Sequence, residues 1–465
     1  MKKKGAITMS NAVKKDTKNS LEEFGYEQEL DRVLGLPAVC LFGFAYLAPC
    51  TIFSYFGLVN GSTHGMMSFA YFIATTAMLF TALSYRQMVK AYPIAGSVYN
   101  YTSRSINPNV GFLSGWVILL DYILLPMINY IIASGFIPLI LPSIPVWLDM
   151  VILVLIVTTI NLVGVKVMST FDNIFIIIQF AFVLTAIIFA VKVIGQHDYT
   201  VFDINGFINT SEWSNVGLNG VVSGAAILCL CFLGFDSVTT LAEEAKDPAK
   251  TVGRALLIIT LCAGGLFIIS TFLFQTAWPE GWKELDPNNG SYQLLGYLGG
   301  QFMATLLCWV MIIACLASAI SSQASCARIL YGMGRDHQLP HKFFGHINKK
   351  FKVPDYNLIL IGVVSLASIW ISLDVGSTMI NFGALLGFTM VNVSVFAHYW
   401  VREGNRGPAA VFKFIILPAC GCVICLYLWV NLGKWALIIG FIWLIIGGIA
   451  LTINKKRGTS LDLNK

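Results

Sequence analysis

Long runs of apolar residues without charge, separated by short polar segments, fill most of the chain. A helix needs about 20 such residues to cross the ~30 Å hydrocarbon core of a bilayer. Windows bounded by charge, glycine or proline therefore predict an all-α integral membrane protein with twelve transmembrane helices. The predicted spans are residues 35–59, 67–90, 108–140, 148–165, 170–194, 218–244, 254–277, 299–330, 356–373, 376–399, 411–430 and 434–453.

The composition excludes several classes of soluble protein. Only 12% of the 465 residues are charged and 57% are hydrophobic, whereas soluble domains carry about 25% charged residues. A cytosolic enzyme, a secreted disulfide scaffold and a nucleic-acid binder are therefore excluded. Nearly all of the eleven cysteines lie in apolar runs, where a free thiol behaves as a small hydrophobe, so we expect no disulfide framework.

The distribution of basic residues predicts the orientation. All but Lys192, Lys283 and Lys434 of the 30 Lys and Arg residues fall on the same side of the predicted membrane as the polar N-terminal segment. The positive-inside rule makes that side cytoplasmic. We therefore expect a protein of the cell membrane with two cytoplasmic tails, residues 1–34 and 454–465, and with membrane lipid around it.

Two predicted spans contain helix-breaking residues at similar depths. The first span carries Gly43 and Pro49, and the sixth carries Gly234 beside Asp236. Unwound backbone is tolerated inside a membrane only where it lines a cavity, so matched breaks point to the binding site of a transporter. Gly43 and Pro49 alone fit a packing glycine and a kink equally well. The acid favours a site, because ionisable residues retained in membranes usually mark substrate or ion paths.

The spacing of the two broken spans predicts a repeat. They are the first and the sixth span, five positions apart in the span order, so they cross the membrane in opposite directions. We expect a transporter core at 35–399, built as a 5+5 inverted repeat with repeat 1 at about 35–194 and repeat 2 at about 218–399. The last two helices, at 411–453, are expected to be peripheral.

Acids, rather than bases, are the ionisable residues expected near the middle of the membrane. Asp121 is followed by Tyr122 in an aromatic stretch that suits an ammonium group, although neighbouring hydroxyls could also cap this carboxylate. The alternative for Asp236 is a structural role, in which its carboxylate accepts hydrogen bonds from backbone amides freed at the break. Either one of Glu243 and Glu244 faces the bundle, or the two form an exposed pair at the span end. The excess of acids favours a cationic substrate, a proton or a sodium ion over an anion.

Three motifs follow one another along the chain. They are PIAGSVYNY at 93–101 with GFLSGW at 111–116, GFD at 234–236 with EE at 243–244 and DP at 247–248, and RILY at 328–331 with GRD at 334–336. On these motifs the chain resembles the amino acid, polyamine and organocation (APC) superfamily over nearly its whole length. The resemblance implies a LeuT-like fold of five plus five inverted repeats with two further helices.

Within the superfamily the chain most resembles the putrescine importer branch, through GFAYLAP at 43–49, LDY at 120–122, LPMIN at 125–129 and GFDSVTTL at 234–241. Amino acid carriers of this class hold the substrate carboxylate on backbone amides of a glycine-rich break in the first span. The corresponding stretch here carries Ala45, Tyr46 and Pro49, and a prolyl nitrogen donates no hydrogen bond, so the carboxylate site is weakened. The resemblance implies secondary active import of a cationic, putrescine-like amine. The alternative is an amino acid permease of the same fold, sodium-coupled or an exchanger.

The resemblance also implies roles for individual residues. Proton coupling through an acid is favoured, with Asp236 or Glu243 as the titrating group, and Ser321 with Ser322 would complete a sodium site. Gln179 stands where some relatives have a titrating lysine. We expect no enzymatic activity, no structural metal and no cofactor beyond the coupling ion, and the oligomeric state stays open. The implied substrate-binding residues are Gly43, Phe44, Ala45, Tyr46, Asp121, Tyr122, Leu233, Gly234, Phe235 and Asp236.

Overall fold

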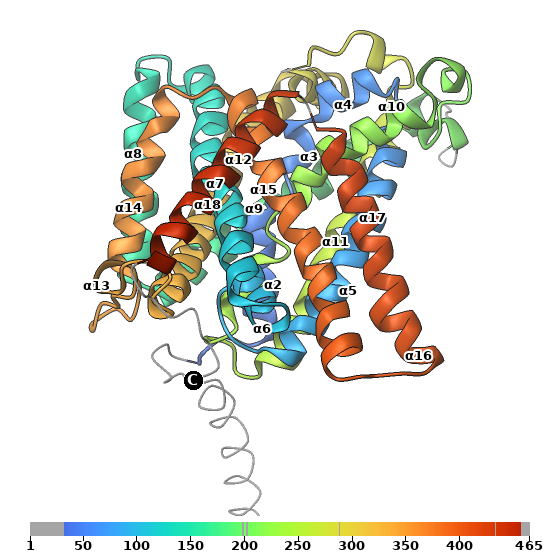
Figure 1. The fold of residues 1–465 in the computed structure, drawn as a ribbon. Helices are drawn as coiled ribbons and strands as arrows, with labels where there is room; N and C mark the ends of the chain where they lie inside the picture. Colours follow the sequence, from blue (N-terminus) through green and yellow to red (C-terminus); the bar gives the residue numbers. More distant parts are fainter. Residues whose placement is uncertain (1–31, 198–199, 201–202, 288, 433, 457–465) are drawn as a thin grey trace, which may run out of the picture.

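The structure is a computed structural model that describes residues 32–197, 200, 203–287, 289–432 and 434–456. These residues fold into helices joined by short loops (Figure 1). The α-helices are α2 (Leu36–Leu47), α3 (Thr51–Ser54), α4 (Phe56–Ser62), α5 (Met67–Ala91), α6 (Ser97–Ser105), α7 (Pro108–Ile140), α8 (Val146–Val163), α9 (Val165–Gln196), α10 (Trp213–Leu228), α11 (Pro248–Ala277), α12 (Gly290–Arg335), α13 (His341–Phe344), α14 (Asp355–Ser365), α15 (Leu373–Val395), α16 (Pro408–Val411), α17 (Leu417–Val430) and α18 (Lys434–Lys456).

Shorter helical turns connect or extend these helices. The 3-10 turns are η1 (Ile204–Gly206), η2 (Cys229–Phe232), η3 (Ser237–Leu241), η4 (Gly281–Lys283) and η5 (Leu366–Ile369), and the π-helical turns are η6 (Phe396–Arg402) and η7 (Phe412–Ile416).

The described residues contain 10 helices that are long and apolar enough to cross a membrane, and two shorter apolar helices at Asp355–Ile369 and Leu437–Ile453. The prediction of an all-helical, multi-pass membrane protein is confirmed. The predicted span at 299–330 corresponds to a helix that already begins at Gly290. A kink at Gly299 and Gly300, which has φ of 68°, separates the added segment from the predicted span.

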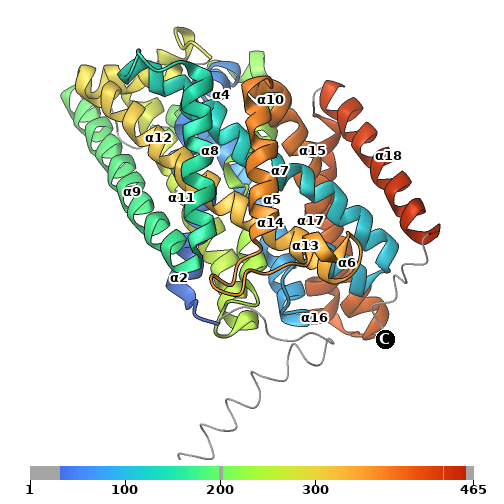
Figure 2. The same ribbon diagram turned by 90° about the vertical axis from the view of Figure 1, so that its left-hand side faces the viewer.

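The core of the bundle is formed by long helices from both halves of the chain. The long helix α7 packs against α12 and α15, and α5 packs along α11. Helices α9 and α18 stand at opposite edges of the molecule (Figure 2). Exposed isoleucines on α9, such as Ile177 and Ile188, suit contact with lipid chains.

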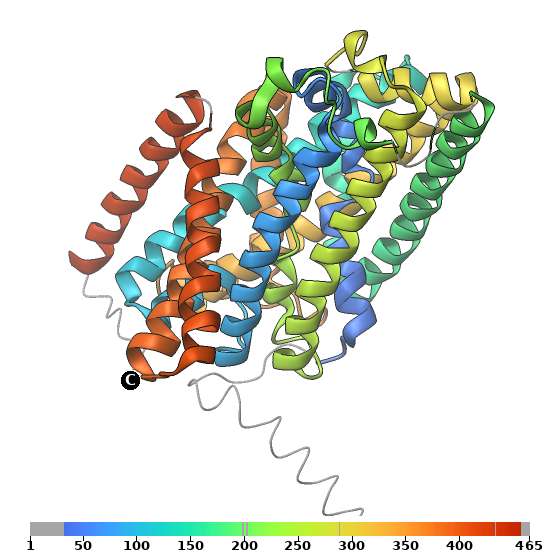
Figure 3. The same cartoon turned by 90° about the vertical axis from the view of Figure 1, so that its right-hand side faces the viewer.

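The last helix, α18, lies apart from the core (Figure 3) and is joined to α7 by two tryptophans. The indole nitrogen of Trp116 donates to the carbonyl of Trp443 at 3.0 Å, and the nitrogen of Trp443 donates to the carbonyl of Trp116 at 2.8 Å. Each buried indole N–H thus finds a partner, and the pair fixes α18 against the core.

We use "basic end" for the end of the bundle at which α2 begins and α12 finishes, which is the lower end in Figure 1. A short backbone pairing closes this end. The Leu34 amide donates to the Glu244 carbonyl at 3.0 Å, and the Lys246 amide donates to the Leu34 carbonyl at 2.9 Å. The segment that leads into α2 is therefore tied to the segment that follows η3.

Candidate transport site at two broken helices

The first broken helix is interrupted between α2 and α3. Ala48 takes a φ of 51°, Pro49 offers no amide, and helix resumes at Thr51. The last carbonyls of a half-helix need partners from elsewhere. The Tyr46 carbonyl receives one from the Ser318 hydroxyl of α12 at 2.7 Å. The break is thus held in place by a neighbouring helix.

This break lies at the Pro49 end of the stretch from Gly43 to Pro49 that the sequence marked. Gly43, Phe44 and Ala45, which the resemblance places in the substrate site, are all helical residues of α2. Gly43 is a packing glycine, because a Cβ there would overlap the side chain of Ile259. The Phe44 ring packs edge-on against Phe180 of α9, with centroids 5.3 Å apart.

The second broken helix is interrupted where the sequence predicted. Between η2 and η3, Leu233 is extended and Gly234 has a φ of 105°, which favours glycine. A Cβ at Gly234 would also overlap the ring of Tyr46. Position 234 therefore needs glycine both for the positive φ and for the space that the Tyr46 ring occupies. The two broken helices touch each other through this contact.

Asp236 lies just after the second break and is only 1% exposed. Its Oδ2 atom accepts hydrogen bonds from the Tyr122 hydroxyl at 2.8 Å and from the Tyr85 hydroxyl at 3.2 Å, while Oδ1 has no partner. The Phe235 ring packs on the Tyr85 ring, with centroids 5.7 Å apart. Tyr85 was not predicted, because nothing in an apolar helix marks which tyrosine meets a distant acid.

Asp121 is buried to the same degree, and its Oδ1 atom also has no hydrogen-bond partner. It lies within electrostatic range of Asp236, and the Tyr46 phenol is in range of both carboxyls. The rings of Tyr46 and Tyr122 meet edge to face, with centroids 5.9 Å apart. The structure thus brings together the predicted acids and tyrosines from α2, α7 and the second break.

A cavity of about 40 Å³ lies beside the two breaks, toward the end opposite the basic end. Tyr46 and Leu233 line it together with polar side chains that include Thr51, Asn129 and Ser318. Its volume is on the order of one or two water molecules. The cavity itself therefore has no room for a larger molecule.

The two glutamates after the second break form ion pairs at the basic end. Arg335 donates to both oxygens of Glu243 at 3.0 and 3.1 Å, and the Ala95 amide also donates to Glu243 at 3.2 Å. Arg328 forms a bidentate pair with Glu244, with one bond at 3.3 Å. Both glutamates are at most 2% exposed, so the alternative of an exposed pair is wrong.

The residues predicted to complete a sodium site have partners within the protein. Ser321 donates to Oδ2 of Asp172 in α9 at 3.1 Å, and Ser322 donates to a carbonyl one turn back in α12. Asp172 is 1% exposed although it lies in the first half of α9. Gln179 accepts from the Cys50 amide at 3.4 Å, which links α9 to the first break.

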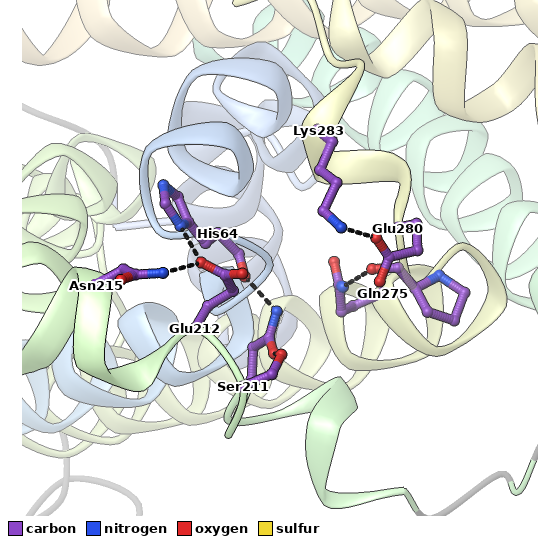
Figure 4. Close-up of polar contacts among 9 residues, drawn as sticks. His64, Ser211, Glu212, Asn215, Gln275, Glu280 and Lys283 are labelled. Atoms are coloured by element: carbon purple, nitrogen blue, oxygen red, sulfur yellow. Dashed lines mark hydrogen bonds and ion pairs between the residues drawn. The ribbon is translucent and has the colours of Figure 1, made fainter.

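A second polar cluster closes the opposite end of the bundle (Figure 4). His64, beyond α4, pairs with Glu212, before α10, at 2.9 Å, and Asn215 donates to the same carboxylate at 2.7 Å. These two hydrogen bonds lower the pKa of Glu212. Lys283 and Glu280 form a separate exposed pair nearby. The cluster joins the outer pieces of both broken helices.

Comparison with known proteins identifies the family. The amino acid permease family model matches residues 47–463. The low-affinity putrescine importer PlaP of Escherichia coli K12 is 38% identical over 92% of this chain and 94% of its own length. The branched-chain amino acid permease BcaP of Bacillus subtilis is 23% identical over 97% and 98%. The vacuolar cationic amino acid transporter 4 of Arabidopsis thaliana is 28% identical over 71% and 56%. This chain therefore belongs to the amino acid permease family of membrane transporters and is not an enzyme.

Proposed function

We propose that the protein imports a putrescine-like diamine by secondary active transport. The observation that carries this proposal is the pair of buried carboxyls, Asp121 and Asp236. In the described part of the chain, no Lys or Arg forms an ion pair with either of them. A buried carboxylate is costly unless a cation or several donors offset its desolvation. A substrate with two ammonium groups supplies the missing charges, and the relative from E. coli is named for putrescine import.

The binding site in this proposal is smaller than the predicted one. Tyr46, Asp121, Tyr122 and Asp236 surround the amine, and Leu233, Gly234 and Phe235 shape the backbone and the wall behind it. Phenol rings can also contact an ammonium through their faces. Gly43, Phe44 and Ala45 belong to the helix that supports Tyr46, so they take no direct part.

The backbone around the first break argues for an amine without a carboxylate. An amino acid substrate would need free amides at the start of α3. The Thr51 and Phe53 amides instead donate to carbonyls at 2.8 and 2.9 Å, and the Cys50 amide faces Gln179. Pro49 has no amide to offer. The amino acid alternative is therefore the weaker one.

The proposed architecture is the twelve-helix, 5+5 inverted repeat. The 10 long helices and two shorter apolar helices are consistent with it, and α17 and α18 would be the two peripheral helices outside the core at 35–399. We assign the basic end to the cytoplasm of a cell membrane, because most Lys and Arg residues lie on that side. Import then requires the opposite end to open first and the basic end second.

We propose proton coupling, with Asp236 as the group that gains and loses the proton. Glu243 is less suited because Arg335 already neutralises it at 3.0 Å. Sodium coupling at Ser321 and Ser322 stays the alternative, since both hydroxyls donate to protein oxygens and keep lone pairs for a cation. Protonation would leave Asp236 uncharged when no amine is present.

Uptake of labelled putrescine into proteoliposomes with an imposed proton gradient tests this function. The proposal expects uptake that depends on the gradient, that excess spermidine competes with, and that the common amino acids do not inhibit. An active preparation that takes up an amino acid but no putrescine would contradict it. Uptake that follows a sodium gradient instead would contradict the coupling alone.

A further inference from the structure

We infer that the ring of Tyr46 is a movable barrier between the outer cavity and the two carboxyls, and that it thereby selects amines by size. The inference rests on the proposed site at Asp236. It goes further by assigning to one side chain the step that admits the amine. Three observations support it, and they concern the position, the bonding and the surroundings of Tyr46.

The position of Tyr46 separates two compartments. Tyr46 lines the small cavity on the outer side, whereas neither Asp121 nor Asp236 does so. Its ring also meets the ring of Tyr122, whose hydroxyl donates to Asp236 at 2.8 Å. An amine that enters the cavity therefore meets Tyr46 before it meets either charge.

Among the described residues, no hydrogen bond holds the ring of Tyr46 in place. The hydroxyl is buried and has no hydrogen-bond partner, so displacing the ring breaks no hydrogen bond. The backbone, in contrast, is held by Ser318 at 2.7 Å. The neighbouring ring of Tyr122 is anchored to Asp236 at 2.8 Å. Of these two tyrosines, Tyr46 is the one that can swing without losing a polar contact.

The surroundings of Tyr46 explain why the barrier is tight. The ring lies directly on Gly234, where a Cβ would overlap it, and its edge meets the Tyr122 ring. Close packing of this kind excludes even small molecules until the ring moves. The width of the gap that opens then depends on how far the ring can turn, which limits the amines that pass.

A native cysteine reports on this barrier. Cys326 of α12 is fully buried, does not line the outer cavity, and lies within electrostatic range of Tyr46 and of Asp121. A thiosulfonate reagent that carries an ethylammonium group resembles one end of a diamine. Its attachment to Cys326 can be measured by peptide mass spectrometry of the whole protein in liposomes. The assay needs no transport, so it remains readable even if putrescine is not the substrate.

Tyr46→Ala should label Cys326 about tenfold faster than the wild type or more, because the labelling rate scales with the fraction of time that the path is open. Tyr46→Phe should label at the wild-type rate, since the lost hydroxyl makes no bond. Tyr130→Ala is the matched control, as Tyr130 is also buried with an unpartnered hydroxyl but lies outside the cavity lining. It should leave Cys326 unchanged.

Cys425, which is fully buried in α17, reports on folding. Where Tyr46→Ala exposes Cys425, Tyr46→Leu, which keeps more of the apolar bulk, replaces it as the deciding variant. Wild-type labelling of Cys326 in a folded variant without the ring would overturn the inference. Equally fast labelling in Tyr46→Phe and Tyr46→Ala would also overturn it, because the hydroxyl and not the ring would then be the barrier.

Discussion

Two pairs of buried acids can be compared in this molecule. Asp236, beside the broken helices, receives side-chain hydrogen bonds from two phenols, and Asp121 and Asp236 each keep one oxygen without a hydrogen-bond partner. Glu243 and Glu244, at the basic end, are as deeply buried but each is paired with an arginine. The first pair therefore lacks a cation, whereas the second pair already has one.

This difference indicates how one fold can assign two roles to the same chemical group. A carboxyl paired with an arginine of the protein holds helices together and loses that contact when they part. A carboxyl bonded only by neutral donors is stabilised further by a cation that arrives from outside. The comparison predicts transport defects from changes at the centre and stability defects from changes at the basic end.

The largest effect is expected from Asp236→Asn. It removes the charge that offsets desolvation of the amine, while the amide can still meet the phenols of Tyr122 and Tyr85. Putrescine uptake in proteoliposomes should fall to background with an unchanged amount of protein in the membrane. Asp149→Asn is the control, because Asp149 is buried but bonded to Ser134 at the edge of the bundle. Normal uptake by Asp236→Asn would remove this residue from the site.

Breaking one ion pair at the basic end is expected to act on stability. Arg328→Met leaves Glu244 charged and buried, and removing one partner of a buried pair costs about 3–5 kcal/mol. The double variant Arg328→Met, Glu244→Leu should recover most of that loss, since no charge is then left buried alone. Thermal unfolding in detergent measures both. A double variant as unstable as the single one would show that the pair is not what Arg328 stabilises.

Removing single hydroxyls from the centre should have a smaller effect. Tyr122→Phe deletes the 2.8 Å bond to Asp236, and Tyr85→Phe deletes the 3.2 Å bond. A hydrogen bond to a charged group contributes about 1.5–3 kcal/mol, so Tyr122→Phe should raise the KM for putrescine roughly tenfold to a hundredfold. Tyr85→Phe should raise it less. A larger rise in KM for Tyr85→Phe than for Tyr122→Phe would mean that the shorter hydrogen bond is not the more important one.

The sequence predicted the helical class and most span limits. A long apolar run that crosses a bilayer must satisfy its own backbone hydrogen bonds, which a helix does, so length and apolarity locate each span. The sequence also predicted the second break, where Gly234 and the neighbouring acid give two signals. It marked the first break by Gly43 and Pro49, but it did not identify Ala48, which takes the positive φ although it is not a glycine. It missed Tyr85, since the contact of Tyr85 with Asp236 joins segments that are distant in sequence.

The smallest effect is expected at the outer cluster, where the Glu212 carboxylate is partly exposed. Hydrogen bonds from Asn215 and His64 hold the pKa of Glu212 below its ordinary value of 4.5. A depressed pKa means that the stabilisation is complete above pH 4.5 and is lost as the pH falls through the lower, folded-state value. Glu212→Gln should therefore lower the unfolding temperature slightly above pH 4.5, and the difference from the wild type should disappear in stronger acid. A difference that grows on acidification would reverse the sign and contradict the assignment. Because solvent screens this pair, its loss should leave putrescine uptake intact, unlike any change at Asp236.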